Sequence, residues 1–456
     1  MKRILYVAIA ACCSYSVADA QETGNLSGNL MLNANFFQRD TTIGAAGNPL
    51  YDNLLSGGES WMSLRYTGLY GFDAFLRVDA LHNSNLKNPT QPLSGFGIGA
   101  WSLSKEIMGL QITAGYIYDQ IGSGILFRAY EDRGLMIDNA LAGVRLKYNI
   151  TPDITVKAFT GQQKNVFERY QPIIKGLNFD GGFTLNENTF LAPGFGVLNR
   201  TLDRNSVDDI LTRVNLLPTD ERFSPKFNMY AFTVYNTLSY KDLSWYIEGA
   251  YKTEEAINDL SGNIFNADGN VLFTTINYAT KGIALTLTGK RTENFAMRTS
   301  PSQVLLNGMA NWQPIIAQIR PQRVIARYSP ASQDLSEIGG SANLLISPSF
   351  DYDFNLSYTH INTLDNLKLY REVWASASIR SIDKWLIDVG VQYLEYNQEF
   401  YQVKPDAGIL KAITPFTEIV YRINNRQSHQ VPGPVYEYQT GLWKLGFCKP
   451  GIRDRP

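Results

Sequence analysis

The sequence lacks most features that would stabilise a disulfide-bonded fold or identify an enzyme. It has three cysteines, and no run after the first twenty residues approaches the roughly 18 apolar residues of a membrane-spanning helix. Neither sign of charge dominates, since 41 basic residues oppose 42 acidic ones, which argues against a nucleic-acid partner. No nucleophile elbow, zinc signature or dinucleotide fingerprint is present. We therefore expect no cofactor, no metal and no enzymatic activity.

The start of the chain is typical of a secretory signal. Lys2 and Arg3 precede an apolar stretch over residues 4–13, and Ala18-Asp19-Ala20 offers a small-x-small cleavage site. This pattern predicts export through the Sec pathway and a mature chain from Gln21. A lipoprotein processed at Cys12 is the alternative, but it would shorten the apolar core. Cleavage at Ala20 leaves Cys448 alone, so no internal disulfide is expected.

The sequence is rich in aromatic residues and in segments in which apolar and polar residues alternate. There are 26 Tyr and 23 Phe among 456 residues, and transmembrane barrels place aromatic girdles at both membrane interfaces. Trp245 and Tyr251 share one parity, whereas Glu248 and Lys252 share the other, and similar runs of about ten residues recur along the chain. The predicted strands are 24–37, 60–70, 72–82, 96–105, 108–119, 140–149, 152–162, 226–240, 242–253, 270–279, 281–292, 340–348, 350–361, 366–380, 383–396 and 410–424.

Short and long connections alternate between these strands. Tight turns fall at sites such as Tyr70-Gly71 and Lys241-Asp242, and nearly every link between them is long. Outer-membrane barrels have this asymmetry, with short periplasmic turns and longer outer loops. We therefore predict an all-β fold, a transmembrane antiparallel up-and-down β-barrel of about 16 strands, within a range of 14 to 18. Residues 1–20 form the signal peptide, 21–445 the barrel and 446–456 an irregular tail.

Three links, residues 120–139, 163–225 and 293–339, are too long for plain loops. Insertions of such length often serve as lids or plugs, so we expect outer loops that fold into the lumen. Within the second link, Val207, Ile210, Leu211 and Val214 have helical spacing after Ser206, which predicts a short helix capped by that serine and folded over or into the barrel mouth.

The densest polar cluster lies in the first link and comprises Arg128, Tyr130, Glu131, Asp132 and Arg133. It has two interpretations: a lumen constriction that sets selectivity, or a self-paired network that pins the loop. Strand charges of both signs point to a wet or loop-plugged lumen. The candidate lumen-facing charges are Arg65, Asp73, Arg77, Asp79, Arg145, Lys147, Glu248 and Lys252.

Several short motifs are spread over the mature chain. They are Gly122-Ser123-Gly124, Arg128 through Gly134, Asp138-Asn139, Gly143-Val144, Phe159 through Gln162, Phe167 through Tyr170, Asn199 through Asp203, and Tyr328 through Gln333. These motifs resemble those of a family of uncharacterised outer-membrane β-barrels of unknown function typical of the Bacteroidota. The resemblance covers most of the mature chain and implies a barrel in the outer membrane, without catalytic residues.

The end of the chain departs from that pattern. Barrels of this class end in an amphipathic strand with a terminal aromatic residue, whereas this chain ends in a basic tail with Pro450 and Pro456. The pattern favours a truncated natural C-terminus. The alternative is closure of the barrel near 410–424 or 435–445.

The main functional prediction is a channel, or the membrane component of a transport or assembly system, in the cell outer membrane. Outer-membrane lipid and the barrel assembly machinery are its expected partners. A second hypothesis is a barrel enzyme or ligand-binding surface protein that uses Tyr130, Glu131 and Asp132. A third is a soluble secreted β-protein whose apolar faces meet one another.

Overall fold

The computed structural model describes residues 24–38, 42, 47, 52–88, 91–259, 261–303, 308–320 and 328–423. It also describes the backbone of β24 (Gln427–Pro432), β25 (Val435–Gln439), β26 (Leu442–Gly446) and β27 (Ile452–Asp454). The predicted signal peptide, Cys12 and Cys448 lie outside the described residues, as does most of the predicted tail. The chain is all-β, with 66% strand and 6% helix, and it divides into two compact units, Met1–Tyr116 and Ile117–Pro456.

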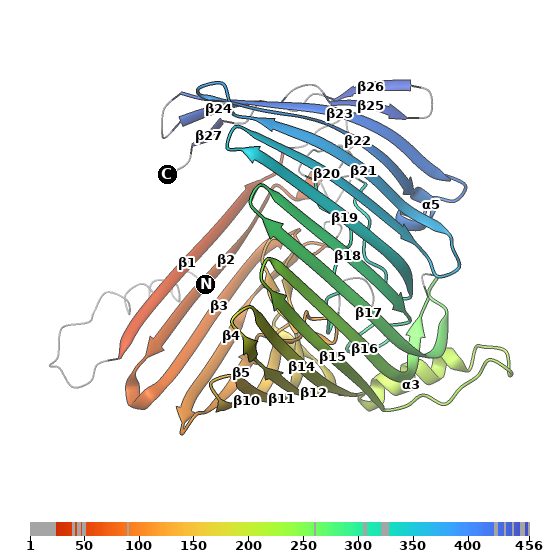
Figure 1. The fold of residues 1–456 in the computed structure, drawn as a ribbon. Helices are drawn as coiled ribbons and strands as arrows, with labels where there is room; N and C mark the ends of the chain where they lie inside the picture. The colour runs from red at the N-terminus through yellow and green to blue at the C-terminus, as the bar shows by residue number, and fades with distance from the viewer. Residues whose placement is uncertain are drawn as a thin grey trace. The chain divides into compact units, whose positions relative to one another are not determined.

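The first unit is an antiparallel meander in which each strand pairs with the next. Two of its connections are short because their residues adopt left-handed backbone conformations, with φ of 51° at both Tyr70 and Met108. Gly71 and Gly109 complete these turns without a steric penalty. The strands are β1 (Asn25–Phe36), β2 (Ser56–Thr67), β3 (Phe72–Ser84), β4 (Leu93–Ile107) and β5 (Leu110–Ile117) (Figure 1).

The second unit has an up-and-down order of thirteen long antiparallel strands. They are β10 (Leu141–Thr151), β11 (Ile154–Asn165), β12 (Glu168–Gly181), β14 (Thr189–Thr201), β15 (Asn228–Tyr240), β16 (Leu243–Asn258), β17 (Ile264–Thr280), β18 (Ile283–Glu293), β19 (Ser336–Ser349), β20 (Tyr352–Asn362), β21 (Lys368–Ile379), β22 (Trp385–Asn397) and β23 (Ile409–Arg422). The short β13 (Phe183–Asn186) pairs with β14.

Eighteen described strands have eight or more residues, two above the predicted count and at the top of the predicted range. The extra two, β12 and β14, lie in the predicted link 163–225, and only two residues join β11 to β12. The sequence did not predict these two strands because both of their faces carry apolar residues, so apolar and polar residues do not alternate along them. Leu177 and Phe195 are exposed on one face, whereas Ile174 and Leu198 are buried on the other.

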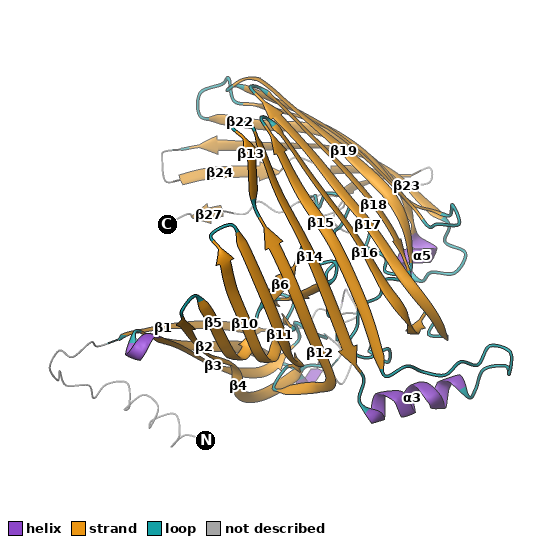
Figure 2. Ribbon diagram, turned by 60° about the horizontal axis from the view of Figure 1, so that its bottom comes forward, coloured by secondary structure: helices purple, strands orange, loops and turns teal. Residues whose placement is uncertain are grey.

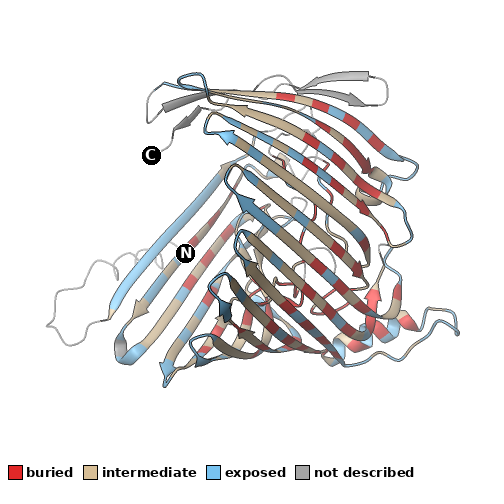
Figure 3. Cartoon of the chain, in the orientation of Figure 1, coloured by how far each residue is buried: buried red, intermediate tan, exposed pale blue. Residues whose placement is uncertain are grey.

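Strands of the second unit have one exposed apolar face and one buried face. Along β15, Tyr230, Phe232 and Val234 are exposed, whereas Ala231 and Thr233 between them are buried. Figure 3 shows this alternation as buried and exposed bands along successive strands. The buried face, hereafter the covered face, carries charged residues such as Glu248 and Lys252, which are 1% and 0% exposed. The predicted two-residue period is confirmed for these strands.

Two of the predicted long links pack against the covered face. Residues 117–139 form two small hairpins, β6 (Asp119–Ile121) with β7 (Phe127–Ala129) and β8 (Glu131–Asp132) with β9 (Ile137–Asp138). Ile125 and Phe127 join an apolar cluster with Phe159, Ile174 and Phe295. The link between β18 and β19 supplies Phe295 to this cluster and Ile316 to a second one near β20–β23. Both links therefore shield part of the covered face.

A helix, α3 (Arg204–Val214), occupies the link between β14 and β15 (Figure 2). The predicted cap was wrong, because Asp203 is the N-cap and Ser206 donates its backbone N–H and hydroxyl to that carboxylate. Val207, Ile210 and Val214 pack against Ala256 and Ile264, so the helix lies on the β16–β17 hairpin. Among the described residues, no helix has the length and hydropathy needed to cross a membrane.

Candidate functional site

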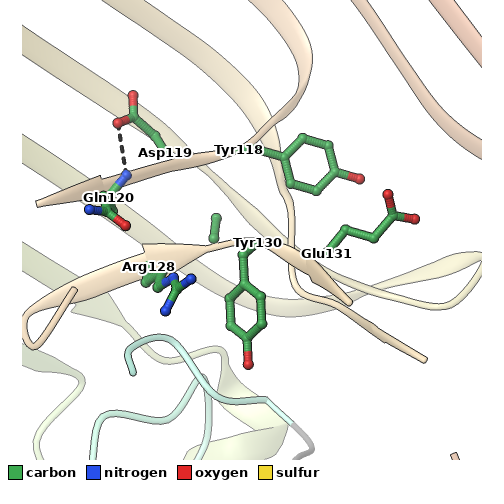
Figure 4. A pocket seen from close by; sticks show the side chains of 7 residues that line it. Tyr118, Asp119, Gln120, Arg128, Tyr130 and Glu131 are labelled. Atoms are coloured by element: carbon green, nitrogen blue, oxygen red, sulfur yellow. Dashed lines mark hydrogen bonds between the residues drawn. The ribbon is translucent and has the colours of Figure 1, made fainter. Parts of the chain in front are cut away.

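A pocket of about 460 Å³ opens beside the first pair of small hairpin strands, β6 and β7 (Figure 4). Its lining combines phenol, amide, guanidinium and carboxylate groups. The residues are Tyr118, Asp119, Gln120, Arg128, Ala129, Tyr130 and Glu131. Antiparallel pairing sets Gln120 opposite Arg128 and Asp119 opposite Ala129, which brings the two halves of the lining together. A polar solute could therefore meet several donors and acceptors at once.

Arg128 is held by aromatic rings. Its guanidinium carbon lies 4.6 Å from the Tyr130 ring centroid and 5.0 Å from that of Trp312. Its backbone N–H donates to Ala310 O at 2.9 Å, which fixes the strand beneath the side chain. Among the described residues, no carboxylate lies within ion-pair distance of this guanidinium, so its charge is available to the pocket. Sequence patterns could not reveal Trp312, which follows 184 positions later.

The predicted polar cluster is divided in the structure. Glu131 pairs with Arg133 at 3.3 Å, and Asp132 is exposed and accepts the Leu135 N–H at 3.1 Å. Arg128, Tyr130 and Glu131 all line the pocket. In Figure 4 the side chains of Arg128 and Tyr130 lie on one side of their strand, and that of Glu131 points to the other. Burial raises the pKa of the Tyr130 phenol, and Asp132 adds to this effect while Arg128 opposes it. The phenol therefore stays protonated and can donate to a solute.

The loop is pinned by an asparagine rather than by ion pairs alone. Asn139 accepts the Tyr130 N–H at 2.6 Å and donates to the carbonyls of Arg128 and Met309, both at 3.1 Å. Its side chain is buried, so these bonds form out of water. Asn139 thus joins the 117–139 segment to the link that contains Met309, a role that the polar-cluster interpretation missed.

Cations outnumber carboxylates beside the pocket, because Arg133 neutralises Glu131. Asp119 accepts Arg145 at 3.1 Å and Lys157 at 3.0 Å. Lys147, also a predicted lumen-facing charge, is half-buried on the same strand as Arg145. Because Asp119 is shared between two cations and Arg128 lacks a carboxylate, this part of the covered face is positive and suits an anionic or polar solute.

Glu248 organises a second polar group on the covered face. It accepts hydrogen bonds from the Thr233 hydroxyl at 2.9 Å, from Tyr246 at 2.6 Å, and from Ser123 through both N–H at 3.0 Å and Oγ at 2.5 Å. The predicted Glu248 is therefore tied to the Gly122-Ser123-Gly124 turn. In the sequence, only the glycine-serine motif marks Ser123 as unusual, and nothing there indicates that it contacts Glu248.

Lys252 belongs to a buried charge network. Glu255 bridges Lys252 and Arg200, each at 2.6 Å, and all three side chains are at most 3% exposed. Lys252 also donates to Ala296 O at 2.9 Å, and Arg200 donates to Arg298 O at 2.9 Å. A similar pair, Lys290 and Glu337, lies 2.6 Å apart, and Lys290 donates to Pro314 O. Buried cations thus hold the backbone of the β18–β19 link.

The first unit carries the other four predicted lumen charges. Arg77 and Asp79 form a buried two-bond pair at 2.7 and 2.9 Å. Arg65 and Asp73 also pair, but Arg65 is 59% exposed. Paired charges of opposite sign are therefore present in this unit as well.

The described residues contain no group of three or more His, Cys, Asp or Glu side chains that could hold a metal ion. His82 is exposed and His360 half-buried, on separate strands of different units. The side chain of His429 lies outside the described residues.

The model of a family of unknown function, DUF6029, matches residues 1–432. No curated protein matches the chain. The solved structures to which the chain is similar include three from Pseudomonas aeruginosa. These are OccK5 (TM-score 0.41, 9% identity, covering 90% of this chain and 98% of that one), the outer membrane protein OpdK (0.40, 10%, 93% and 95%) and OccK8 (0.41, 9%, 88% and 94%).

Proposed function

The chain belongs to DUF6029, a family of unknown function, and from its structure we propose that it is an outer-membrane β-barrel through which small polar solutes pass. The mature chain, residues 21–445 as predicted, would form the barrel. The barrel assembly machinery would insert it after export. No reaction is assigned to it.

One observation carries this proposal: the polarity of the sheet is inverted relative to a water-soluble protein. On β15 to β17, Phe232, Val234 and Leu272 are exposed, whereas Glu248 and Lys252 are buried on the opposite face. Water-soluble proteins rarely expose wide apolar surfaces, since each exposed Å² costs about 25 cal/mol. Lipid removes that cost. In lipid the backbone must also be fully paired, which a closed barrel achieves.

Charges and pockets on the covered face support passage of polar solutes. Arg128, Tyr130 and Glu131 line the pocket described above, and a further pocket of about 310 Å³ includes Lys157, Asp180 and Tyr246. The 117–139 segment and the β18–β19 link pack on the same face. We therefore expect a narrow path with selectivity rather than a wide pore.

Cell fractionation followed by gel mobility with and without boiling tests the membrane proposal. Recovery in the outer-membrane fraction and a mobility shift on boiling are expected for a closed barrel. Extraction into aqueous buffer without detergent would contradict it and favour the secreted β-protein. Planar-bilayer recording then tests the channel: small, discrete conductance steps are expected, and an electrically silent but heat-modifiable barrel would favour a ligand-binding surface protein instead.

A further inference from the structure

A row of charged side chains crosses the otherwise apolar outer face of β20–β23. Backbone register sets His360 opposite Arg371, Arg371 opposite Glu395, and Glu395 opposite Lys411. These residues share the parity of exposed apolar residues such as Tyr358, Val373 and Ile413, not that of the covered face. The row therefore lies where the proposed function places lipid.

Basic groups exceed acidic ones within this row. Glu395 Oε2 lies 2.9 Å from Lys368 Nζ and 3.7 Å from Arg371 Nη1, and Glu395 Oε1 lies 4.0 Å from Lys411 Nζ. The Tyr393 hydroxyl donates to the same carboxylate at 2.7 Å. Three cations thus surround one acid that is only 5% exposed, while the cations themselves are 33% to 65% exposed. We call Lys368, Arg371 and Lys411 the basic triad.

Other exposed ion pairs of the second unit are balanced. Arg291 pairs with Glu293 at 2.7 Å, and Lys226 pairs with Glu254 at 2.9 Å. The basic triad differs because its positive charge is in excess. Two nitrogen atoms in the row, Arg371 Nε and His360 Nδ1, are also buried without a hydrogen-bond partner. The hydrogen-bonding capacity of this row is therefore not used up by Glu395.

The position of the basic triad along the strands limits what can bind. Lys368 opens β21 directly after the link 363–367, and Lys411 is the third residue of β23, after the link 398–408. The opposite ends of the strands carry links that are together shorter, the two-residue turn 350–351 between β19 and β20 and the five-residue link 380–384 between β21 and β22. In an outer-membrane barrel the longer links face the cell exterior, so the triad would lie at headgroup depth of the outer leaflet.

We propose that the basic triad binds the phosphate of a phosphorylated glycolipid in the outer leaflet, with the acyl chains of the lipid against Tyr358, Val373 and Ile413. This inference rests on the proposed membrane function. Phosphate carries a charge of roughly −1.5 to −2 and takes charge-assisted hydrogen bonds from Lys and Arg. Glu395 holds the three cations at one place, and its single negative charge leaves their excess for the headgroup.

The test uses the full chain in phosphatidylcholine nanodiscs, titrated with fluorescent diphosphorylated lipid A. The variant Lys368→Gln/Arg371→Gln/Lys411→Gln should bind roughly a hundredfold more weakly, since each of the three basic residues near a membrane surface contributes about a fivefold factor. Lys411→Gln alone, at the most exposed position, should lose severalfold. Arg371→Lys with Lys411→Arg should keep most of the affinity. The matched control Lys226→Gln/Arg291→Gln, which removes two balanced cations, should bind as the wild type does.

Three outcomes would overturn the inference. If the wild type, the triple Gln variant and Lys411→Gln bound lipid A equally well, the basic triad would not be part of the lipid-binding site. Equal binding of dephosphorylated lipid A would exclude phosphate as the recognised group, and full displacement by millimolar inorganic phosphate would indicate a free-phosphate site. Failure of the proposed function is distinct: the wild type would then leave the membrane fraction or show no mobility shift on boiling.

Discussion

At the scale of single residues, neighbours in sequence experience opposite environments. Glu254 is 53% exposed and pairs with Lys226, whereas Glu255 is 3% exposed and bridges Lys252 and Arg200. A β-bulge between Lys252 and Glu255 turns both of these side chains to the covered face. The contribution of an ion pair to the free energy of unfolding depends on how far the pair is buried.

Glu255→Gln should therefore destabilise the fold strongly. The substitution leaves Lys252 and Arg200 buried without a counter-charge, and we expect the free energy of unfolding in urea to fall by about 3 to 5 kcal/mol. The matched control is Glu254→Gln, for which little change is expected because its pair is exposed to solvent. Equal effects of the two substitutions would show that the buried network does not stabilise the fold.

Arg128→Gln should change ion selectivity without unfolding the chain. The guanidinium faces the pocket between the rings of Tyr130 and Trp312, so its loss removes positive charge from the proposed path. A unit charge about 4 Å away changes the energy of a permeating ion by about 1 kcal/mol or more, so the cation-to-anion permeability ratio should rise at least about fivefold. Reversal potentials across a KCl gradient measure this ratio. An unchanged ratio, matching that of the exposed-face control Arg291→Gln, would place Arg128 outside the path.

At the scale of elements, local capping decides how firmly the β14–β15 link is held. Asp203 caps α3, and three buried residues of that helix pack on the β16–β17 hairpin. Strands β15, β16 and β17 are held by backbone hydrogen bonds to their neighbours, whereas the helix is stabilised mainly by its N-cap and by one row of apolar side chains. The link should therefore open before the sheet does.

Asp203→Ala should loosen α3 by about 1 kcal/mol, because the backbone N–H of Ser206 loses its acceptor. Limited proteolysis within residues 202–227 should then be roughly fivefold faster if cleavage follows local opening. Asp203→Asn should retain most of the protection. The control Asp208→Ala changes an exposed residue of the same helix and should leave the rate unchanged. Faster cleavage in that control would implicate charge rather than capping.

At the scale of the whole molecule, the exposed apolar face distinguishes a membrane protein from a water-soluble one, because its side chains contact lipid in the first case and water in the second. Val234 is 63% exposed in β15, between Phe232 and Asn236 on the same parity. In lipid an arginine at mid-strand costs about 2 to 4 kcal/mol, whereas on a water-exposed strand it costs little.

Val234→Arg should therefore reduce the folded, heat-modifiable fraction recovered from outer membranes. Phe350→Arg is the matched control, because Phe350 is 87% exposed in the β19–β20 turn and should tolerate the charge. Band densities of unboiled samples measure the folded fraction. Equal recovery of both variants would argue against lipid contact at β15.

Local sequence pattern was enough to predict the all-β class, the antiparallel order and the two faces of strands such as β16. Side chains alternate with a period of two in any strand, so Trp245 and Glu248 had to take opposite faces. Only the folded chain reveals β12 and β14: residues 117–139 pack on their covered face and bury Ile174 and Leu198, so both faces are apolar and the two-residue alternation is lost. Tertiary structure alone also placed Trp312 beside Arg128 and three cations around Glu395, since strand register and loop packing join residues that no local pattern connects.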